Sequence, residues 1–168
     1  MSKIWWHLKG IVRSLIEMKK NAIYITLLFL SFALNAGKKD LTDQQVVALT
    51  ILGEARGEGA QGMYGVACVI AERSINWKRN GRKQTPRQVC LVDKQFECWN
   101  NGKMPSERLL DTPQGKYALY LAMNIKRVDR SYVNFADHFC HIKKNPYWAS
   151  GRKPVAIIKK HKFFKLRG

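Results

Sequence analysis

The chain has 168 residues, of which 46% are hydrophobic and 25% are charged, a balance typical of one globular domain with its own core. This composition excludes wholesale disorder, and it excludes a multi-span membrane protein because one stretch alone, residues 22–36, is apolar enough to enter a bilayer. The 30 Lys and Arg residues outnumber the 12 Asp and Glu residues, for a net charge of +18. Such a charge predicts an anionic partner: nucleic acid, a membrane surface or a cell-wall polymer.

The segment that begins at Met18 has the three-part order of a secretory signal peptide. Two lysines come first, then the apolar run over residues 22–36, which ends in small residues. We therefore predict that residues 1–36 are a basic extension plus signal peptide, and that residues 37–168 are an exported domain in the periplasm or the extracellular cell wall. A signal anchor is the alternative, although the apolar run is short for a membrane span, which needs roughly 20 apolar residues.

Removal of the export segment leaves 25 basic and 11 acidic residues, so a charge of +14 belongs to the exported domain. Peptidoglycan with its stem-peptide carboxylates, anionic glycopolymers and membrane headgroups are the anions available to such a protein. We expect no nucleic acid partner, because no nucleic-acid-binding fingerprint occurs in the sequence. The domain is expected to be a monomer.

Four cysteines lie in the exported domain, and an even number in an exported chain predicts two disulfides. Cys90 and Cys98 close a short loop, so we pair these two residues and pair Cys68 with Cys140. A zinc site is the alternative, but the sequence has no Cys-x-x-Cys pair and its histidines are irregularly spaced. We therefore expect neither a metal ion nor a cofactor.

Helical signals dominate the first two thirds of the exported domain. Thr42 and Gln45 have the spacing of a capping box, and Thr-Pro pairs at Thr85 and Thr112 are typical of helix starts. Apolar residues recur with a helical period after each start. Helices are predicted over about 43–53, 62–76, 86–90 and 113–127, with a basic loop at 78–83.

Helical periodicity then gives way to aromatic residues and to Pro and Gly. Val155–Ile158 and His161–Phe164 have the pattern of short strands around a turn. The predicted fold class is mainly α, of the α+β type, with a small antiparallel β element near the C-terminus.

Glu54 is the first candidate for chemistry. It ends an otherwise apolar helix, and glycines at positions 53, 57, 59 and 62 allow the backbone there to turn sharply and to approach a ligand. Partial desolvation and the negative end of the helix dipole both favour the protonated carboxyl group that a general acid requires. The alternative is a solvated surface cluster in which Glu54 and Glu58 flank Arg56.

The wider pattern resembles the SleB-like cell-wall hydrolases, a family that includes spore-cortex-lytic enzymes and phage endolysins. The similarity runs from about residue 41 to residue 164, in the family's order. The segments that carry it are Ile51–Gly59, Gly62–Ala67, Val69–Arg73, Gln95–Asn100, Ala136–Phe139, Pro146–Ala149 and His161–Phe164.

The resemblance implies a lysozyme-like, lytic-transglycosylase-like fold and cleavage of the β-1,4 bond between N-acetylmuramic acid and N-acetylglucosamine. The family's catalytic glutamate falls on Glu54, and Glu58 receives a supporting role in substrate binding. A glycosidic oxygen leaves only when it is protonated, which a buried glutamate with a raised pKa achieves.

A hydrolase of this kind needs a second carboxylate, about 5–5.5 Å away when it retains configuration and farther when it inverts. The available acids show no diagnostic spacing: Glu58, Asp93, Glu97, Asp111 and Asp137. We therefore favour a lytic transglycosylase, in which one glutamate acts as acid and base and the product is a 1,6-anhydromuramic end; a hydrolytic muramidase or glucosaminidase is the alternative.

The other motif residues are assigned to a glycan cleft. Gln95 is suited to an acetamido group, and Phe96 and Trp99 to stacking on pyranose rings. A core role is an equal alternative for Phe96. The cleft residues expected on the C-terminal side, each with packing as the alternative, are His138, Tyr147, Trp148 and His161.

Two departures from the family pattern concern substrate details. Lys159-Lys160 stands where the family commonly has a Gly-Asn-like turn, and Phe139 stands where an aromatic hydroxyl often follows the histidine. The added lysines make the tail, residues 159–167, strongly basic around two phenylalanines. This tail supports the rival hypothesis, a non-catalytic basic protein that binds an anionic membrane or a wall polymer.

Overall fold

A computed structural model describes residues 41–79 and 81–167, and its helical part is built around helix α2 (Asp43–Ala55). The predicted capping box opens this helix: the hydroxyl of Thr42 accepts a hydrogen bond from the Gln45 amide, and the Gln45 side chain accepts one from the Thr42 amide. Almost every residue of the helix from Val46 onward is buried. Because it is apolar around most of its circumference, α2 is the central helix of the fold rather than an amphipathic surface helix.

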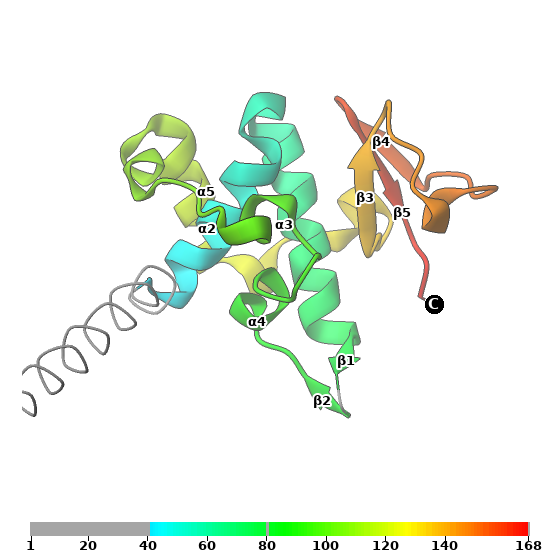
Figure 1. Ribbon diagram of the computed structural model, residues 1–168, viewed down its shortest axis with the longest axis horizontal. Coiled ribbons are helices and arrows are strands. Elements are labelled where there is room, and N and C mark those ends of the chain that lie inside the picture. Colours follow the sequence, from blue (N-terminus) through cyan, green and yellow to red (C-terminus); the bar gives the residue numbers. More distant parts are fainter. Residues whose placement is uncertain (1–40, 80, 168) are drawn as a thin grey trace, which may run out of the picture. The chain divides into compact units, whose positions relative to one another are not determined.

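Helices α3 (Gly59–Asn76), α4 (Pro86–Cys90) and α5 (Pro113–Met123) pack against α2 (Figure 1). The predicted Thr-Pro starts of α4 and α5 are confirmed, since Thr85 and Thr112 are their N-caps. Short 3-10 helices fill the connections: η1 (Arg56–Glu58), η2 (Glu97–Gly102), η3 (Glu107–Asp111), η4 (Ile125–Arg127), η5 (Arg130–Val133) and η6 (Tyr147–Ala149).

A three-stranded antiparallel sheet lies beside α3 (Figure 1). Its central strand is β5 (His161–Phe164), flanked by β3 (His138–His141) and β4 (Ala156–Ile158). The two predicted strands are confirmed, and β3 completes the sheet by pairing with β5 over its whole length. The expected fold class, mainly α with a small antiparallel β element, is confirmed.

Strand β5 joins two parts of the core. Phe163 points toward α3, where a Cβ atom added at Gly65 would come within 2.7 Å of its ring. Phe164, the next residue, faces the other side of the sheet and packs against Trp148 and Ala149. Glycine at position 65 therefore permits the close contact between α3 and the sheet.

The rival hypothesis expects the two phenylalanines of the basic tail to be available to a membrane, and the structure differs from this expectation. Phe163 is fully buried and Phe164 is 2% exposed, so neither ring is available to a membrane. The amides of Leu166 and Arg167 both donate to the carboxylate of Asp137, which fixes the end of the chain. The expected amphipathic tail is the central strand of a sheet and its continuation.

The predicted basic loop is a small hairpin. Strands β1 (Lys78–Arg79) and β2 (Arg82–Lys83) pair antiparallel, with Lys78 opposite Lys83. The turn between them contains Gly81 at φ +76°, a left-handed conformation that glycine adopts without steric cost.

All four cysteines are free thiols in this structure, so the two expected disulfides are not formed. Cys68 hydrogen-bonds the carbonyl of Asp129 and Cys140 that of Lys144, in two separate core clusters. Burial raises the pKa of the Cys68 and Cys90 thiols to about 12, which disfavours the thiolate that disulfide exchange needs.

The predicted signal peptide or anchor at residues 1–36, with its apolar run at 22–36, lies outside the described residues. Within the part of the chain that the structure describes, no helix has the length and apolar character to cross a membrane.

Candidate active site

Glu54 lies in the last turn of α2, against the first turn of η2. Its Oε1 atom accepts a hydrogen bond of 3.0 Å from the backbone amide of Cys98, and the Cys98 thiol also hydrogen-bonds the carboxylate. This approach depends on the neighbouring glycine, because a Cβ atom at Gly53 would lie 2.5 Å from the Cβ of Cys98. The Gly-Glu pair thus presents a carboxyl group while its own backbone packs against η2.

The pKa of Glu54 is raised above the ordinary value of 4.5. Burial is the largest cause, and the nearby charge of Glu97 adds to it, while the hydrogen bonds from Cys98 act in the opposite direction. Burial disfavours the charged carboxylate, and a neighbouring negative charge does the same. The pKa of Glu54 is thus raised by burial, the direction that its position at the end of a buried helix predicted.

Glu58 and His161 form a second part of the site, where η1 meets the turn between β4 and β5. A carboxylate oxygen of Glu58 accepts a hydrogen bond of 2.8 Å from the backbone amide of Lys160. His161 is 6% exposed, and its Nδ1 atom has no hydrogen-bond partner among the described residues. Burial lowers the pKa of His161, and the charge of Glu58 partly opposes that shift. The neutral imidazole is therefore the favoured form.

The lysine pair in this turn has a structural explanation. Lys159 has φ +52°, the left-handed conformation that glycine and asparagine adopt most easily. Lys160 binds Glu58 through its backbone rather than its side chain. The contact to Glu58 therefore does not depend on the Lys160 side chain, and the lysine pair adds charge at the surface.

Phe139 occupies the space between the two parts of the core. Its ring lies 5.2 Å from that of His161, 6.3 Å from that of Phe96 and 6.0 Å from that of Phe163, between ring centroids. Phe139 therefore has a packing role between these rings.

The residues of the Gln-Phe-x-x-Trp motif have different environments. Phe96 is 1% exposed and Trp99 is 6% exposed, and the Trp99 indole donates to the Thr50 hydroxyl at 2.8 Å. Neither ring has a free face for a sugar, so the stacking prediction is corrected to a core role that positions η2 under Glu54. Gln95 is half-buried and lines an open cavity near the end of α3.

Two of the residues expected on the C-terminal side, His138 and Trp148, form a separate aromatic cluster with Trp77. The ring of His138 lies 5.3 Å from Trp77 and 5.1 Å from Trp148, and its Nδ1 is 3.0 Å from a carboxylate oxygen of Asp137. Tyr147 is 92% exposed and is available for ligand contact. The structure therefore groups His138 and Trp148 around Asp137, and His161 with Glu58.

The acids that could serve as a second carboxylate have different environments in the structure. Glu97 is exposed, pairs with Lys144 at 3.1 Å, and is close enough to raise the pKa of Glu54. Asp137 is buried and used by backbone amides and His138. Asp93 and Asp111 are exposed. Among these acids, Glu97 is the one whose charge contributes to the raised pKa of Glu54.

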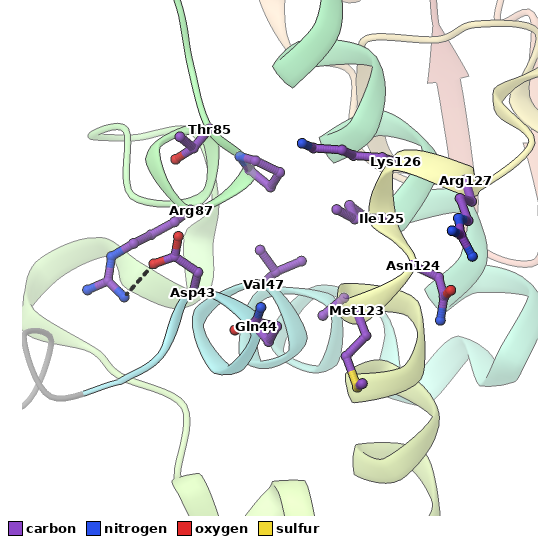
Figure 2. Close-up of a pocket in the computed structure, with 12 residues that line it drawn as sticks. Asp43, Gln44, Val47, Thr85, Arg87, Met123, Asn124, Ile125, Lys126 and Arg127 are labelled. Atoms are coloured by element: carbon purple, nitrogen blue, oxygen red, sulfur yellow. Dashed lines mark ion pairs between the residues drawn. The ribbon is translucent and has the colours of Figure 1, made fainter.

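A cavity of about 580 Å³ opens at the other end of α2 (Figure 2). It is lined by Asp43, Val47 and Arg127 among others, and Asp43 pairs with Arg87 at 3.6 Å on its edge. Asp43 precedes Glu54 by eleven residues, which is about 16 Å along a helix. This cavity is therefore remote from the candidate acid.

Metal chemistry has no cluster to support it in the described residues. No group of three or more His, Cys, Asp or Glu side chains comes together there as a possible metal site.

The backbone partners of the site have no signal in the sequence. The amides of Cys98 and Lys160 hold the two glutamates, and a backbone amide carries no residue-type signal. Gly53, beside Glu54, was the available clue, because a glycine at a helix end often marks a close approach of another segment.

Comparison with known proteins gives one finding. A family model described as Cell Wall Hydrolase matches residues 57–164, more than half of the chain. No curated protein and no solved structure matches. The matched range includes Glu58, Gln95 and His161, and begins three residues after Glu54.

Proposed function

This chain belongs to the cell wall hydrolase family, and from that premise we propose that it cleaves the β-1,4 glycosidic bond between N-acetylmuramic acid and N-acetylglucosamine, with Glu54 as the general acid. Peptidoglycan is the substrate, and the chain acts at the cell wall. The observation that carries the proposal is the half-buried Glu54 carboxyl group, held at 3.0 Å by the Cys98 amide and with a raised pKa.

The first step is protonation of the leaving oxygen. The protonated Glu54 donates its proton to the glycosidic oxygen while the bond from that oxygen to C1 of the muramic residue breaks. The departing sugar leaves with a hydroxyl group, and Glu54 becomes a carboxylate. Cys98 then supports this form, because its amide and thiol hydrogen bonds favour the charged carboxylate.

The second step uses the same residue as a base. The Glu54 carboxylate takes the proton of the muramic 6-hydroxyl as that oxygen attacks C1, which closes a 1,6-anhydro ring. The proton returns to Glu54, and no water is consumed. One carboxyl group suffices for both steps, in keeping with the absence of a diagnostic acid pair in the sequence.

Hydrolysis is the alternative, and a specific observation favours one partner for it. The charge of Glu97 reaches Glu54, so Glu97 can serve as the base that activates a water molecule. In that mechanism the products have ordinary reducing muramic ends.

Glu58 and His161 are assigned as positioning residues. Glu58 links η1 to the turn before β5 through the Lys160 amide, so it fixes the segment that follows Glu54. Tyr147, with its exposed ring, is assigned to the outer wall of the glycan cleft.

The test is a digestion of purified peptidoglycan with the full chain, followed by the masses of the released muropeptides. Products one water lighter than ordinary reducing muropeptides are expected from the unmodified chain and are expected to disappear in Glu54→Gln. Asp43→Asn is the matched control, since it makes the same chemical change at the exposed start of the same helix. Full-mass products whose release requires Glu97 would show that the chain is a hydrolase and not a transglycosylase. Activity of Glu54→Gln equal to that of the unmodified chain would refute the assignment of Glu54.

A further inference from the structure

A second, smaller cavity of about 170 Å³ lies where the end of α3 meets the β1–β2 hairpin and the end of the chain. Four cations line it, with no acidic side chain among the lining residues: Arg73, Lys78, Arg79 and Arg167. The remaining walls are apolar or amide groups, including Trp77, Val89 and Gln95. Its volume equals that of about five or six water molecules in the liquid, enough for one small anionic group and a short aliphatic stem.

Arg73 gives this cavity a built polar wall. The residue is 4% exposed and its Nε atom donates to the backbone carbonyl of Asp137 at 2.6 Å. Its Nη1 atom is buried and has no hydrogen-bond partner in the described part of the chain. A buried donor without a partner is costly, and an anion in the cavity would supply the missing acceptor.

Trp77 holds the cationic groups in place. The guanidinium carbon of Arg73 lies 4.6 Å from the Trp77 ring and that of Arg167 lies 4.2 Å from it. The indole nitrogen of Trp77 is also buried and without a partner among the described residues. Two residues that line this small cavity thus carry orphaned N–H donors, and two guanidinium groups lie against the Trp77 ring in its wall. The charge of the nearby Asp137 carboxylate favours the charged form of Arg73, but Asp137 is not among the residues that line the cavity, and its carboxylate accepts the Leu166 and Arg167 amides and lies beside His138.

A short segment of the chain runs from the wall of the cavity to the candidate acid. Gln95 lines the cavity, and Cys98, three residues later, donates to Glu54. Three residues span at most about 11 Å. A peptide of three to five residues reaches about 10–18 Å, so a stem peptide attached to a muramic residue near Glu54 is long enough to enter the cavity.

From this geometry we infer that the cavity lined by Arg73, Trp77 and Arg79 binds a carboxylate of the peptidoglycan stem peptide. The inference rests on the proposed function, since it presumes that a glycan lies at Glu54. A planar guanidinium group matches a carboxylate with two parallel hydrogen bonds. The walls formed by Trp77 and Val89 suit the aliphatic part of an amino acid better than a heavily hydrated phosphate.

Direct binding to the full chain tests the cavity separately from catalysis. The probes are a synthetic stem tripeptide with free carboxylates, the same tripeptide with its carboxylates amidated, and inorganic phosphate. Titrations are followed by the NMR signal of the Trp77 indole N–H, assigned with Trp77→Phe. The free tripeptide is expected to shift that signal and to bind at least about tenfold tighter than the amidated one, as for loss of a charge-assisted hydrogen bond.

The β1–β2 hairpin offers a matched pair of variants. Lys78→Gln with Arg79→Gln removes two cations that line the cavity, whereas Arg82→Gln with Lys83→Gln removes two exposed cations of the partner strand that do not line it. The first pair is expected to weaken tripeptide binding about fivefold or more, and the second less than about twofold. Arg73→Lys, which keeps the charge and removes the guanidinium fork, is expected to weaken binding as well, with a melting curve as the check on folding.

The substrate assignment is tested on glycan. The unmodified chain is expected to have a KM about tenfold lower for peptidoglycan with free stem carboxylates than for the amidated polymer, and the Lys78/Arg79 variant is expected to lose this difference. Cleavage without any preference between the two polymers, and without tripeptide binding, overturns the carboxylate site and leaves the proposed function intact. Tripeptide binding without cleavage supports the cavity as a carboxylate site and contradicts the proposed function. Phosphate binding in preference to the tripeptide overturns the stem-peptide assignment in favour of a phosphate ligand.

Discussion

At the scale of single residues, opposing influences set the pKa of Glu54. Burial and the charge of Glu97 favour its protonated form, and the Cys98 hydrogen bonds favour the carboxylate. A group that serves in turn as acid and base benefits from such a balance, because neither protonation state is strongly disfavoured.

The pH dependence of activity follows from the sign of these effects. Activity requires protonated Glu54 in the first step, so it falls as the pH rises through the raised pKa. Glu97→Gln removes a repulsive charge and is expected to move this alkaline limb to lower pH. Lys144→Gln removes the cation paired with Glu97 at 3.1 Å and is expected to move the limb to higher pH.

The measurement is kcat/KM against pH for both variants beside the unmodified chain. Shifts of the same sign in the two variants would contradict the electrostatic link between Glu97 and Glu54. Complete loss of activity in Glu97→Gln alone would instead identify Glu97 as the second carboxylate of a hydrolase.

Gly53 is a second residue whose replacement has a defined outcome. A Cβ atom at this position would lie 2.5 Å from the Cys98 Cβ and 3.0 Å from its sulfur, so Gly53→Ala must displace η2. Because a misplacement of about 1 Å can cost about a hundredfold in rate, we expect kcat to fall by about tenfold to a hundredfold. Gly57→Ala is the control, since nothing lies within 4 Å of its added Cβ. Equal kcat values for the two variants would show that the Gly53 contact does not position Glu54.

At the scale of elements, β5 is the strand on which the C-terminal region depends. It pairs on both sides, with β3 and with β4. A chain that ends at Pro154 loses both β4 and β5, so it tests stability rather than membrane binding by the tail. That truncation removes part of the sheet together with the tail, so it cannot test the tail alone.

Phe163→Ala provides a graded test of β5. The ring is fully buried between α3 and the sheet, so we expect a loss of about 3–5 kcal/mol in the free energy of unfolding. Ile157→Ala on β4, at a side chain that is 57% exposed, is expected to change it by about 0.5 kcal/mol or less. Urea unfolding curves of the two variants give both values, and similar losses would contradict the central position of Phe163.

At the scale of the whole molecule, the state of the cysteines in the structure differs from the two disulfides that the sequence predicted. All four cysteines are free, three are buried, and Cys98 is the accessible one. The raised pKa of Cys98 slows its reaction, since the thiolate is the reactive form.

The expected result is slow labelling of one thiol by an alkylating reagent in the folded chain and of four thiols after unfolding without a reductant. Intact mass spectrometry counts the labels. A protein that accepts no label after unfolding, with a mass four hydrogens lower, would establish the two disulfides that the sequence predicted.

Charge is also a property of the whole molecule, and the fold gives part of it a location. The excess of basic residues is spread along the sequence, so composition predicts an anionic partner without a place for it. Folding brings the end of α3, β1 and the last residues of the chain together around one cavity. Three cations from residues 73–79 and one from the end of the chain then line a single small volume.

The sequence by itself determined the local features of this protein. Helix starts at Thr42, Thr85 and Thr112 follow from caps within three or four residues, and the apolar pattern marks the helices. The position of Glu54 at the end of a buried helix, beside a glycine, was likewise visible before folding. These features depend on neighbours along the chain.

Only the tertiary structure decided which motif residues are buried and which groups meet. Phe96 and Trp99 are core residues, Cys98 faces Glu54, and β3 pairs with β5 across 20 to 26 residues of sequence. Burial and pairing over such separations depend on how all the helices pack, and an aromatic residue in a motif has the same letter whether it faces a sugar or the core. The backbone amides that hold both glutamates were likewise decided by the tertiary structure, because every residue except proline carries a backbone N–H group.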